Sequence, residues 1–82
     1  SMTPFIAVYE EGGGMSEPTP YEGEAFVFVL DGRIGVEFEG GESIVLEEGD
    51  TAYIRTTSRR AYRNAGEGPA RLLGVIARPA GA

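Results

Sequence analysis

The side chains that most often carry acid–base or nucleophilic chemistry are missing from this sequence. Its 82 residues include no histidine and no cysteine, and its seven basic residues are all arginine. Histidine is the commonest metal ligand and general base. Without histidine, cysteine or lysine, general-base catalysis is left to carboxylates and tyrosines, and no nucleophile–base pair is visible. The composition therefore favours a binding role over an enzymatic one, and leaves the enzymatic alternative open.

Two groups of carboxylates have a spacing that suggests chemistry. Glu22 and Glu24 could form an acid–base pair. In the strand predicted below, however, both have the parity opposite to the interior residues, so we interpret them as surface residues. The acidic turn at residues 47–50 lacks the alternating acidic positions and the terminal glutamate of a calcium-binding loop. A solvated turn is the simpler interpretation.

Positive charge is concentrated in a polar segment at residues 55–63, which contains four of the arginines. A guanidinium group presents five donors in a fork that suits a carboxylate or a phosphate. Arg60, Tyr62 and Asn64 alternate along the chain, so on a strand they share one face. In a domain with thirteen carboxylates, arginines are more often partners in surface ion pairs. A surface and an interior position for Arg60 both remain possible from the sequence.

The elements that must position these side chains are organised around residues 23–38, GEAFVFVLDGRIGVEF. The dipeptide Asp31-Gly32 between two apolar runs is typical of a two-residue type I′ hairpin. This turn predicts that Leu30 pairs with Arg33 and that Val29 opposes Ile34. One face of the hairpin is then wholly apolar and is the expected interior: Ala25, Val27, Val29, Ile34, Val36 and Phe38. The other face carries Phe26, Phe28 and Leu30, which a second sheet or a partner subunit must cover.

Further short strands are predicted along the rest of the chain. Glycine-rich or polar turns separate the predicted strands, which are residues 5–9, 42–46, 51–55, 61–64 and 70–77. No segment has a helical period. Short strands at this spacing indicate an all-β sandwich or barrel.

The length and charge limit the possible classes of protein. We expect residues 1–2 to be a cloning remnant and residues 3–82 to form a single domain. The net charge of −6 makes direct contact with nucleic acid or an anionic membrane unfavourable. No apolar run has membrane-spanning length and no signal peptide is visible, so we expect a cytoplasmic protein.

The sequence resembles the cupin superfamily over nearly its whole length. Residues 21–32, YEGEAFVFVLDG, resemble the first cupin motif, and residues 41–64 resemble the second, with an acidic turn and a closing asparagine. The final strand after the turn GEGP also matches. With residues 4–14, PFIAVYEEGGG, and residues 22–32, EGEAFVFVLDG, the sequence also resembles the C-terminal cupin domain of bacterial helix-turn-helix transcriptional regulators. The cupin resemblance implies a small double-sheet β-barrel of the jelly-roll type.

The positions of the metal ligands depart from the cupin pattern. Metal-binding cupins supply two histidines and a glutamate from the first motif and one more histidine from the second. The matching positions here are Thr19, Tyr21, Ala25 and Arg60. None of these residues is a usual ligand of a first-row metal. We therefore expect neither a metal nor another cofactor, and no metal-dependent activity.

The same positions suggest a different use of the barrel. If the family's ligand positions point inward, Arg60 places a permanent positive charge at the cavity. We expect Arg60, with Tyr21, Tyr62 and Asn64 as polar walls, to hold a small anionic or amphipathic ligand. The simpler alternatives are that Tyr21 and Tyr62 are core residues with a hydrated hydroxyl and that Asn64 caps a turn.

These expectations combine into a functional hypothesis. The chain is expected to be the ligand-sensing and dimerisation module of a transcriptional regulator whose DNA-binding part lies upstream, outside this chain. A homodimer is expected, with residues 5–9 as a candidate edge strand. The alternatives are a stand-alone cupin that acts as a binding protein or a metal-free isomerase, and a structural module with a filled barrel.

Overall fold

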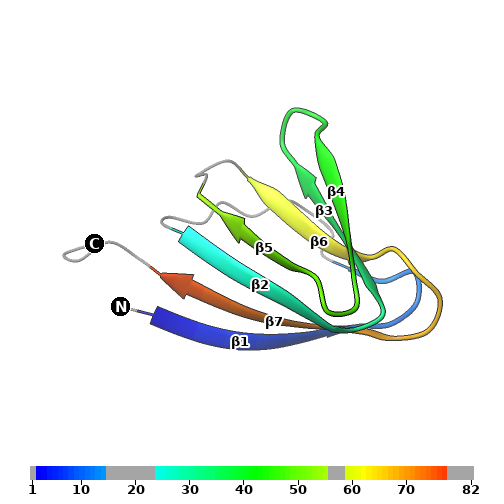
Figure 1. Ribbon diagram of the computed structural model, residues 1–82. Coiled ribbons are helices and arrows are strands. Elements are labelled where there is room, and N and C mark those ends of the chain that lie inside the picture. The colour runs from blue at the N-terminus through cyan, green and yellow to red at the C-terminus, as the bar shows by residue number, and fades with distance from the viewer. Residues whose placement is uncertain (1, 15–23, 56–58, 78–82) are drawn as a thin grey trace.

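The residues that the structure describes form seven β-strands in two antiparallel sheets (Figure 1). The computed structural model describes residues 2–14, 24–55 and 59–77. The strands are β1 (Met2–Tyr9), β2 (Glu24–Asp31), β3 (Arg33–Phe38), β4 (Ser43–Glu47), β5 (Thr51–Ile54), β6 (Arg60–Asn64) and β7 (Ala70–Ala77). Sheet A has the order β1-β7-β2-β5, and sheet B has the order β4-β3-β6. The expected all-β, double-sheet architecture is confirmed, and each predicted strand is present with ends within three residues of the prediction.

The core lies between the two sheets, and on β2 burial alternates along the first six residues. On β2, Ala25, Val27 and Val29 are buried, while Glu24 and Phe26 are exposed. On β3, Ile34 and Val36 are buried on the opposite side of the core. The apolar face that the sequence predicted for residues 25–36 is therefore the interior. Phe38, at the end of β3, packs against the core and is partly buried.

The predicted hairpin at Asp31-Gly32 is wrong. Strand β2 pairs with β5 and β7 in sheet A, whereas β3 pairs with β4 and β6 in sheet B. A type I′ turn requires a positive φ at both central residues, but only Gly32 has one, at 80°. Asp31 is the last residue of β2 and pairs with Arg71. The chain thus crosses from one sheet to the other at Gly32, and Val29 and Ile34 lie on opposite walls of the core rather than side by side.

The two sheets converge at one end and separate towards the other (Figure 1). One long side is closed by residues 10–14, because Gly14 bridges to Arg63 and the Asn64 amide donates to the Gly13 carbonyl at 2.9 Å. On the other long side β4 and β5 are the outermost strands of their sheets. The tight turn between them, residues 48–50, joins them at the convergent end. Within the described residues there is no helix that could cross a membrane.

Candidate functional site

Arg60 is completely buried, with a relative exposure of 0%. It opens β6 and pairs with Phe38 of β3, while Tyr62 pairs with Val36 and Asn64 with Ile34. Because Ile34 and Val36 point into the core, their direct neighbours on β6 point inward too. The surface position considered for Arg60 is therefore excluded, and the three residues predicted to share a face do so in the interior.

A hydrogen bond links the two polar side chains at the open end of this row. Arg60 Nε donates to the Tyr62 hydroxyl at 3.2 Å, and both groups are buried. A guanidinium group stays charged under all ordinary conditions, and removing a charge from water costs several kcal/mol unless other groups compensate. The interior of the sandwich therefore contains a positively charged group, held in place by a phenol oxygen from the same strand.

Other arginines occupy the surface, as the simpler interpretation predicted. Arg33 contacts Glu47 at 2.8 Å, Arg63 contacts Glu37 at 2.7 Å, and Arg55 lies 3.7 Å from Glu24. These side chains are between two-fifths and three-quarters exposed. Exposed pairs of this kind contribute about 0–1 kcal/mol each. What distinguishes Arg60 is therefore its location between the sheets.

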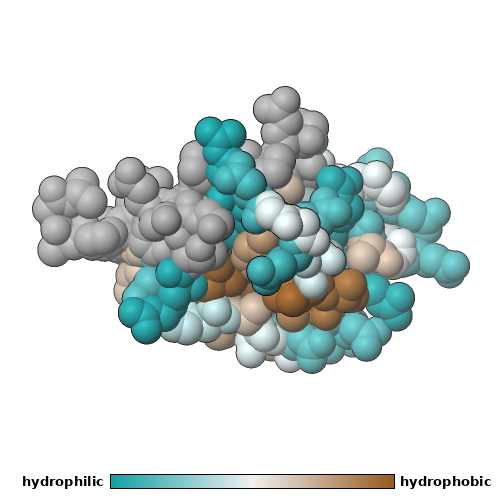
Figure 2. Space-filling model, turned by 90° about the horizontal axis from the view of Figure 1, so that it is seen from above, coloured by the Kyte–Doolittle hydropathy of each residue, from teal (hydrophilic) through white to brown (hydrophobic). Residues whose placement is uncertain are grey.

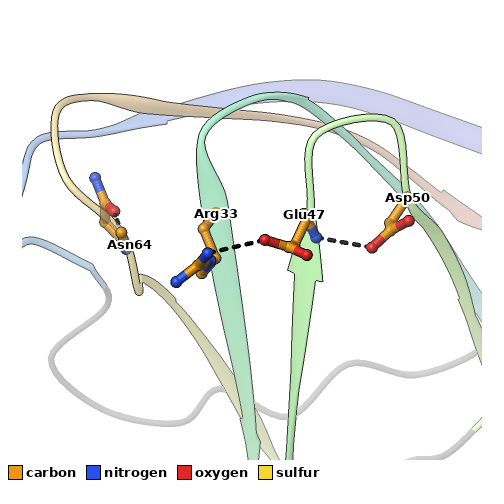
Figure 3. A network of polar contacts seen from close by, with 5 residues as sticks. Arg33, Glu47, Asp50 and Asn64 are labelled. Carbon is orange, nitrogen blue, oxygen red and sulfur yellow. Dashed lines mark hydrogen bonds and ion pairs between the residues drawn. The ribbon is translucent and has the colours of Figure 1, made fainter.

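Asn64 ties together the convergent end of the sandwich. Its Nδ2 donates to the carbonyl oxygens of Tyr9 at 3.2 Å and Gly68 at 2.7 Å, and its Oδ1 accepts from the Gly66 amide at 2.9 Å. This geometry confirms the interpretation of Asn64 as a turn cap. Figure 3 shows Asn64 beside the exposed pair Arg33–Glu47. Because both amide hydrogens of Asn64 are used by backbone groups, a ligand contact by this residue remains a prediction only.

The acidic turn at residues 47–50 is held by hydrogen bonds within itself. The Asp50 side chain accepts from the Glu47 amide at 2.9 Å, and the Asp50 amide donates to the Glu47 carbonyl at 2.8 Å (Figure 3). Glu47 also pairs with Arg33. An open hollow of about 820 Å³ lies between this turn and residues 65–67. The carboxylates of the turn are exposed. We therefore interpret the turn as solvated, as the sequence predicted.

Two of the four positions that the cupin resemblance assigns to metal ligands, Ala25 and Arg60, lie within the described residues. Ala25 offers only a methyl group to the interior, and Arg60 places a cation where a ligand would be required. Among residues 2–14, 24–55 and 59–77 there is no cluster of three or more histidine, cysteine, aspartate or glutamate side chains able to hold a metal ion. The other two positions, Thr19 and Tyr21, lie outside the described residues, as does Glu22. A divalent cation next to a buried guanidinium is electrostatically unfavourable, so the residues seen do not fit such a group.

A groove opens along the side where β4 and β5 are the outermost strands. Its volume is about 410 Å³, and it is lined by Phe38, Glu39, Glu42, Ile44, Ala52, Tyr53, Ile54 and Arg55. Figure 2, which views the molecule from above relative to Figure 1, shows apolar surface bordered by hydrophilic side chains. Phe38, one wall of the groove, pairs with Arg60 on the neighbouring strand. The groove could not be predicted from the sequence, because it depends on β4 and β5 belonging to different sheets.

Comparisons with known proteins agree on the fold. A family model described as "Cupin domain" matches residues 5–76. A cupin family protein from Methanocaldococcus jannaschii, with a double-stranded β-helix fold, superposes with a TM-score of 0.83 at 16% identity, over 94% of this chain and 70% of that chain. A cupin protein from Bacteroides fragilis gives a TM-score of 0.83 at 21% identity, over 99% and 69%.

An enzyme is also among the similar structures. Hydroxypropylphosphonic acid epoxidase from S. wedmorenis, in complex with fosfomycin, superposes with a TM-score of 0.78 at 23% identity. The match covers 94% of this chain but 44% of the epoxidase. This chain thus spans less than half of that enzyme, and the likeness concerns the fold. No curated protein sequence matches the chain significantly.

Proposed function

The chain belongs to the cupin family, and from that premise we propose that it is a metal-free, small-molecule-binding domain whose interior arginine, Arg60, recognises an anionic group. The observation that carries this proposal is the complete burial of Arg60 between the sheets. In the family resemblance this position belongs to a metal-ligating histidine. A cation at that position repels a metal ion and attracts an anion.

The geometry around Arg60 supports an anionic ligand on energetic grounds. A carboxylate or phosphate group that meets a guanidinium away from water forms short, charge-assisted hydrogen bonds, roughly twice as strong as neutral ones. The Tyr62 hydroxyl accepts from Arg60 Nε and so lies next to the guanidinium group. Tyr21, predicted to be a further wall, lies outside the described residues.

The shape of the molecule supports an amphipathic ligand with an apolar body. The side groove has a volume of about 410 Å³, within the range of about 300–1,000 Å³ typical of small-molecule sites. Ile44, Ala52 and Ile54 line it, and Phe38, which also lines it, pairs with Arg60 on the neighbouring strand. We propose that the apolar part of the ligand occupies the groove while its anionic group lies against Arg60.

The biological role that we propose is ligand sensing within a cytoplasmic transcriptional regulator. The resemblance of residues 4–14 and 22–32 to the corresponding regulator domains supports it, and the net charge of −6 fits a module that does not itself touch DNA. An effector would shift such a regulator between two states only by its difference in affinity for them. The alternative, a stand-alone binding protein or metal-free isomerase, would be supported by turnover of a sugar acid or keto acid that is lost in Tyr21→Phe.

Native mass spectrometry with metal analysis of the same sample tests the proposal first. We expect no stoichiometric metal, and extra mass if a ligand is carried through purification. Stoichiometric transition metal would overturn the metal-free assignment. The second step is titration with a panel of small carboxylates and phosphate esters, read by thermal shift and calorimetry.

Two variants make the titration specific for Arg60. In Arg60→Met the anion-dependent thermal shift should vanish, while folding in the absence of ligand is retained, because an apolar side chain of similar length fills the same space. Arg59→Met removes the same charge from the adjacent, exposed position and should leave binding unchanged. Equal affinity in wild type and Arg60→Met, or a loss of affinity in both variants, would contradict the assignment of Arg60 as the anion-binding residue.

A further inference from the structure

A single row of side chains crosses sheet B near the turn between β3 and β4, at the end where the two sheets separate (Figure 1). Arg60 of β6 pairs with Phe38 of β3. On the other side of Phe38 the pairing of β3 with β4 continues to the residue just before β4, because the Phe38 amide donates to the Glu42 carbonyl at 2.8 Å. Directly opposed residues share a face of a sheet. Arg60, Phe38 and Glu42 therefore form one row on the inner side of sheet B.

This row has opposite charges at its two ends. Arg60 is buried, whereas Glu42 is exposed and lines the side groove together with Phe38. Neighbouring strands lie about 4.8 Å apart, so the backbones of Arg60 and Glu42 are separated by roughly 10 Å. A molecule that spans the row meets a cation at one end, an aromatic ring in the middle and a carboxylate at the other end.

The mouth of the groove has an excess of negative charge. Within residues 2–14, 24–55 and 59–77, neither Glu42 nor Glu39, which also lines the groove, takes part in an ion pair. The groove's one arginine among these residues, Arg55, lies 3.7 Å from Glu24. A cleft lined by one sign of charge attracts groups of the opposite sign. The groove mouth therefore favours a cationic group on the ligand.

We propose that the ligand of this domain is zwitterionic: an ω-amino acid whose carboxylate lies against Arg60 and whose ammonium group lies beside Glu42. Its methylene chain lies along Phe38 and Ile44 of the groove. The inference rests on the proposed function, because it assigns the second end of the ligand that Arg60 binds. A fatty acid has no group for Glu42, and a dicarboxylate brings a second negative charge next to it.

The contribution of Glu42 to binding is expected to be modest, because its carboxylate is exposed. An ion pair at an exposed site changes an affinity by about twofold to fivefold. Glu42 is therefore a specificity residue, which discriminates between ligands that differ in their second group, while Arg60 holds the group that they share. Since salt screens exposed charges, this discrimination should weaken as the ionic strength rises.

Calorimetric titration of the complete chain with two matched pairs of ligands tests the inference. One pair is ε-aminocaproate and caproate, and the other is δ-aminovalerate and valerate, so only the terminal amino group differs within a pair. In Glu42→Gln the ratio of the affinity for the amino acid to that for the fatty acid should fall by about twofold to fivefold in at least one pair. The affinity for the fatty acid itself should not fall.

The matched control is Glu48→Gln. It removes the same charge from the exposed acidic turn at the convergent end, and it should leave the affinity ratio unchanged. Neither substitution alters a buried side chain, and Glu42→Gln keeps the backbone hydrogen bond to Phe38.

The outcomes separate this inference from the proposed function. If the fatty acids bind through Arg60 but the ratio is the same in wild type and Glu42→Gln, the inference is overturned and the proposed function stands. An equal fall of the ratio in Glu48→Gln would reflect net charge alone and would also overturn it. If none of the four compounds binds, the ω-amino acid assignment is wrong, and the wider panel of carboxylates and phosphate esters decides the proposed function separately.

Discussion

The ring of Phe5 lies directly over the bare α-carbon of Gly74, on the inner side of sheet A. The two residues are opposed in the pairing of β1 with β7. A Cβ placed on Gly74 would be 2.2 Å from Cζ of Phe5, well inside van der Waals contact. The missing side chain of one strand thus makes room for the aromatic side chain of the other. This contact packs β1 closely against β7.

We expect Gly74→Ala to destabilise the protein by about 1–3 kcal/mol, because the ring of Phe5 must move out of a packed position. Gly35→Ala is the control. Gly35 is also a buried strand glycine, but a Cβ there would meet its nearest atom, Cβ of Ala65, at an ordinary 3.6 Å. Urea denaturation should place Gly35→Ala within about 0.5 kcal/mol of wild type, or slightly above it. Equal loss in both variants would contradict the steric explanation.

Asn64→Ala should lower the free energy of unfolding by about 2–4 kcal/mol. The substitution removes three hydrogen bonds and leaves the carbonyls of Tyr9 and Gly68 without this donor. As a comparison at the same end of the molecule, Glu47→Gln weakens the exposed pair with Arg33 and should cost less than about 1 kcal/mol. If chemical denaturation ranks the two variants in the opposite order, the three hydrogen bonds of Asn64 do not stabilise this end of the molecule as proposed.

The hydrogen bond to the Glu24 carboxylate raises the pKa of Tyr53 above its ordinary value. Because the folded-state pKa is raised, the neutral phenol is favoured, and this contact contributes stability at neutral pH that is lost as the pH rises through the folded pKa. The ultraviolet absorbance difference between wild type and Tyr53→Phe reports this one titration. The titration of Tyr53 should begin at a higher pH than that of a free tyrosine. In a Glu24→Gln background it should return towards the ordinary range, and an unchanged curve there would refute the cause.

Alternation along the strands is the part of the fold that the sequence determines best. The period of two placed Ala25, Val27, Val29, Ile34 and Val36 in the core, and it placed Arg60, Tyr62 and Asn64 on one face. Both predictions rest on local geometry that each strand has by itself. Alternation does not say which strand lies beside which. For that reason the pairing predicted at Asp31-Gly32 was wrong even though the inward face was right.

The candidate site could be predicted only in part. Sequence alone could not choose between a surface and an interior position for Arg60, since a charged residue in a polar segment usually stays in water. In the structure Arg60 pairs with Phe38 and Tyr62 pairs with Val36, which places Arg60 in the interior. The side groove was invisible in the sequence because it is formed by strands that are not hydrogen-bonded to each other. Likewise, the signal that could have revealed the Phe5–Gly74 contact is a lone glycine within an apolar strand, which often marks a close approach.

The order of strands in sheet A has a consequence for synthesis of the protein. The last strand in the chain, β7, lies between β1 and β2 and is hydrogen-bonded to both. Both flanking strands are therefore synthesised before the strand that joins them. Strand β1 cannot pair with β7 until nearly the whole domain has left the ribosome. We expect nascent chains that end before residue 70 to remain protease-sensitive, with folding beginning only once the final strand is free of the exit tunnel.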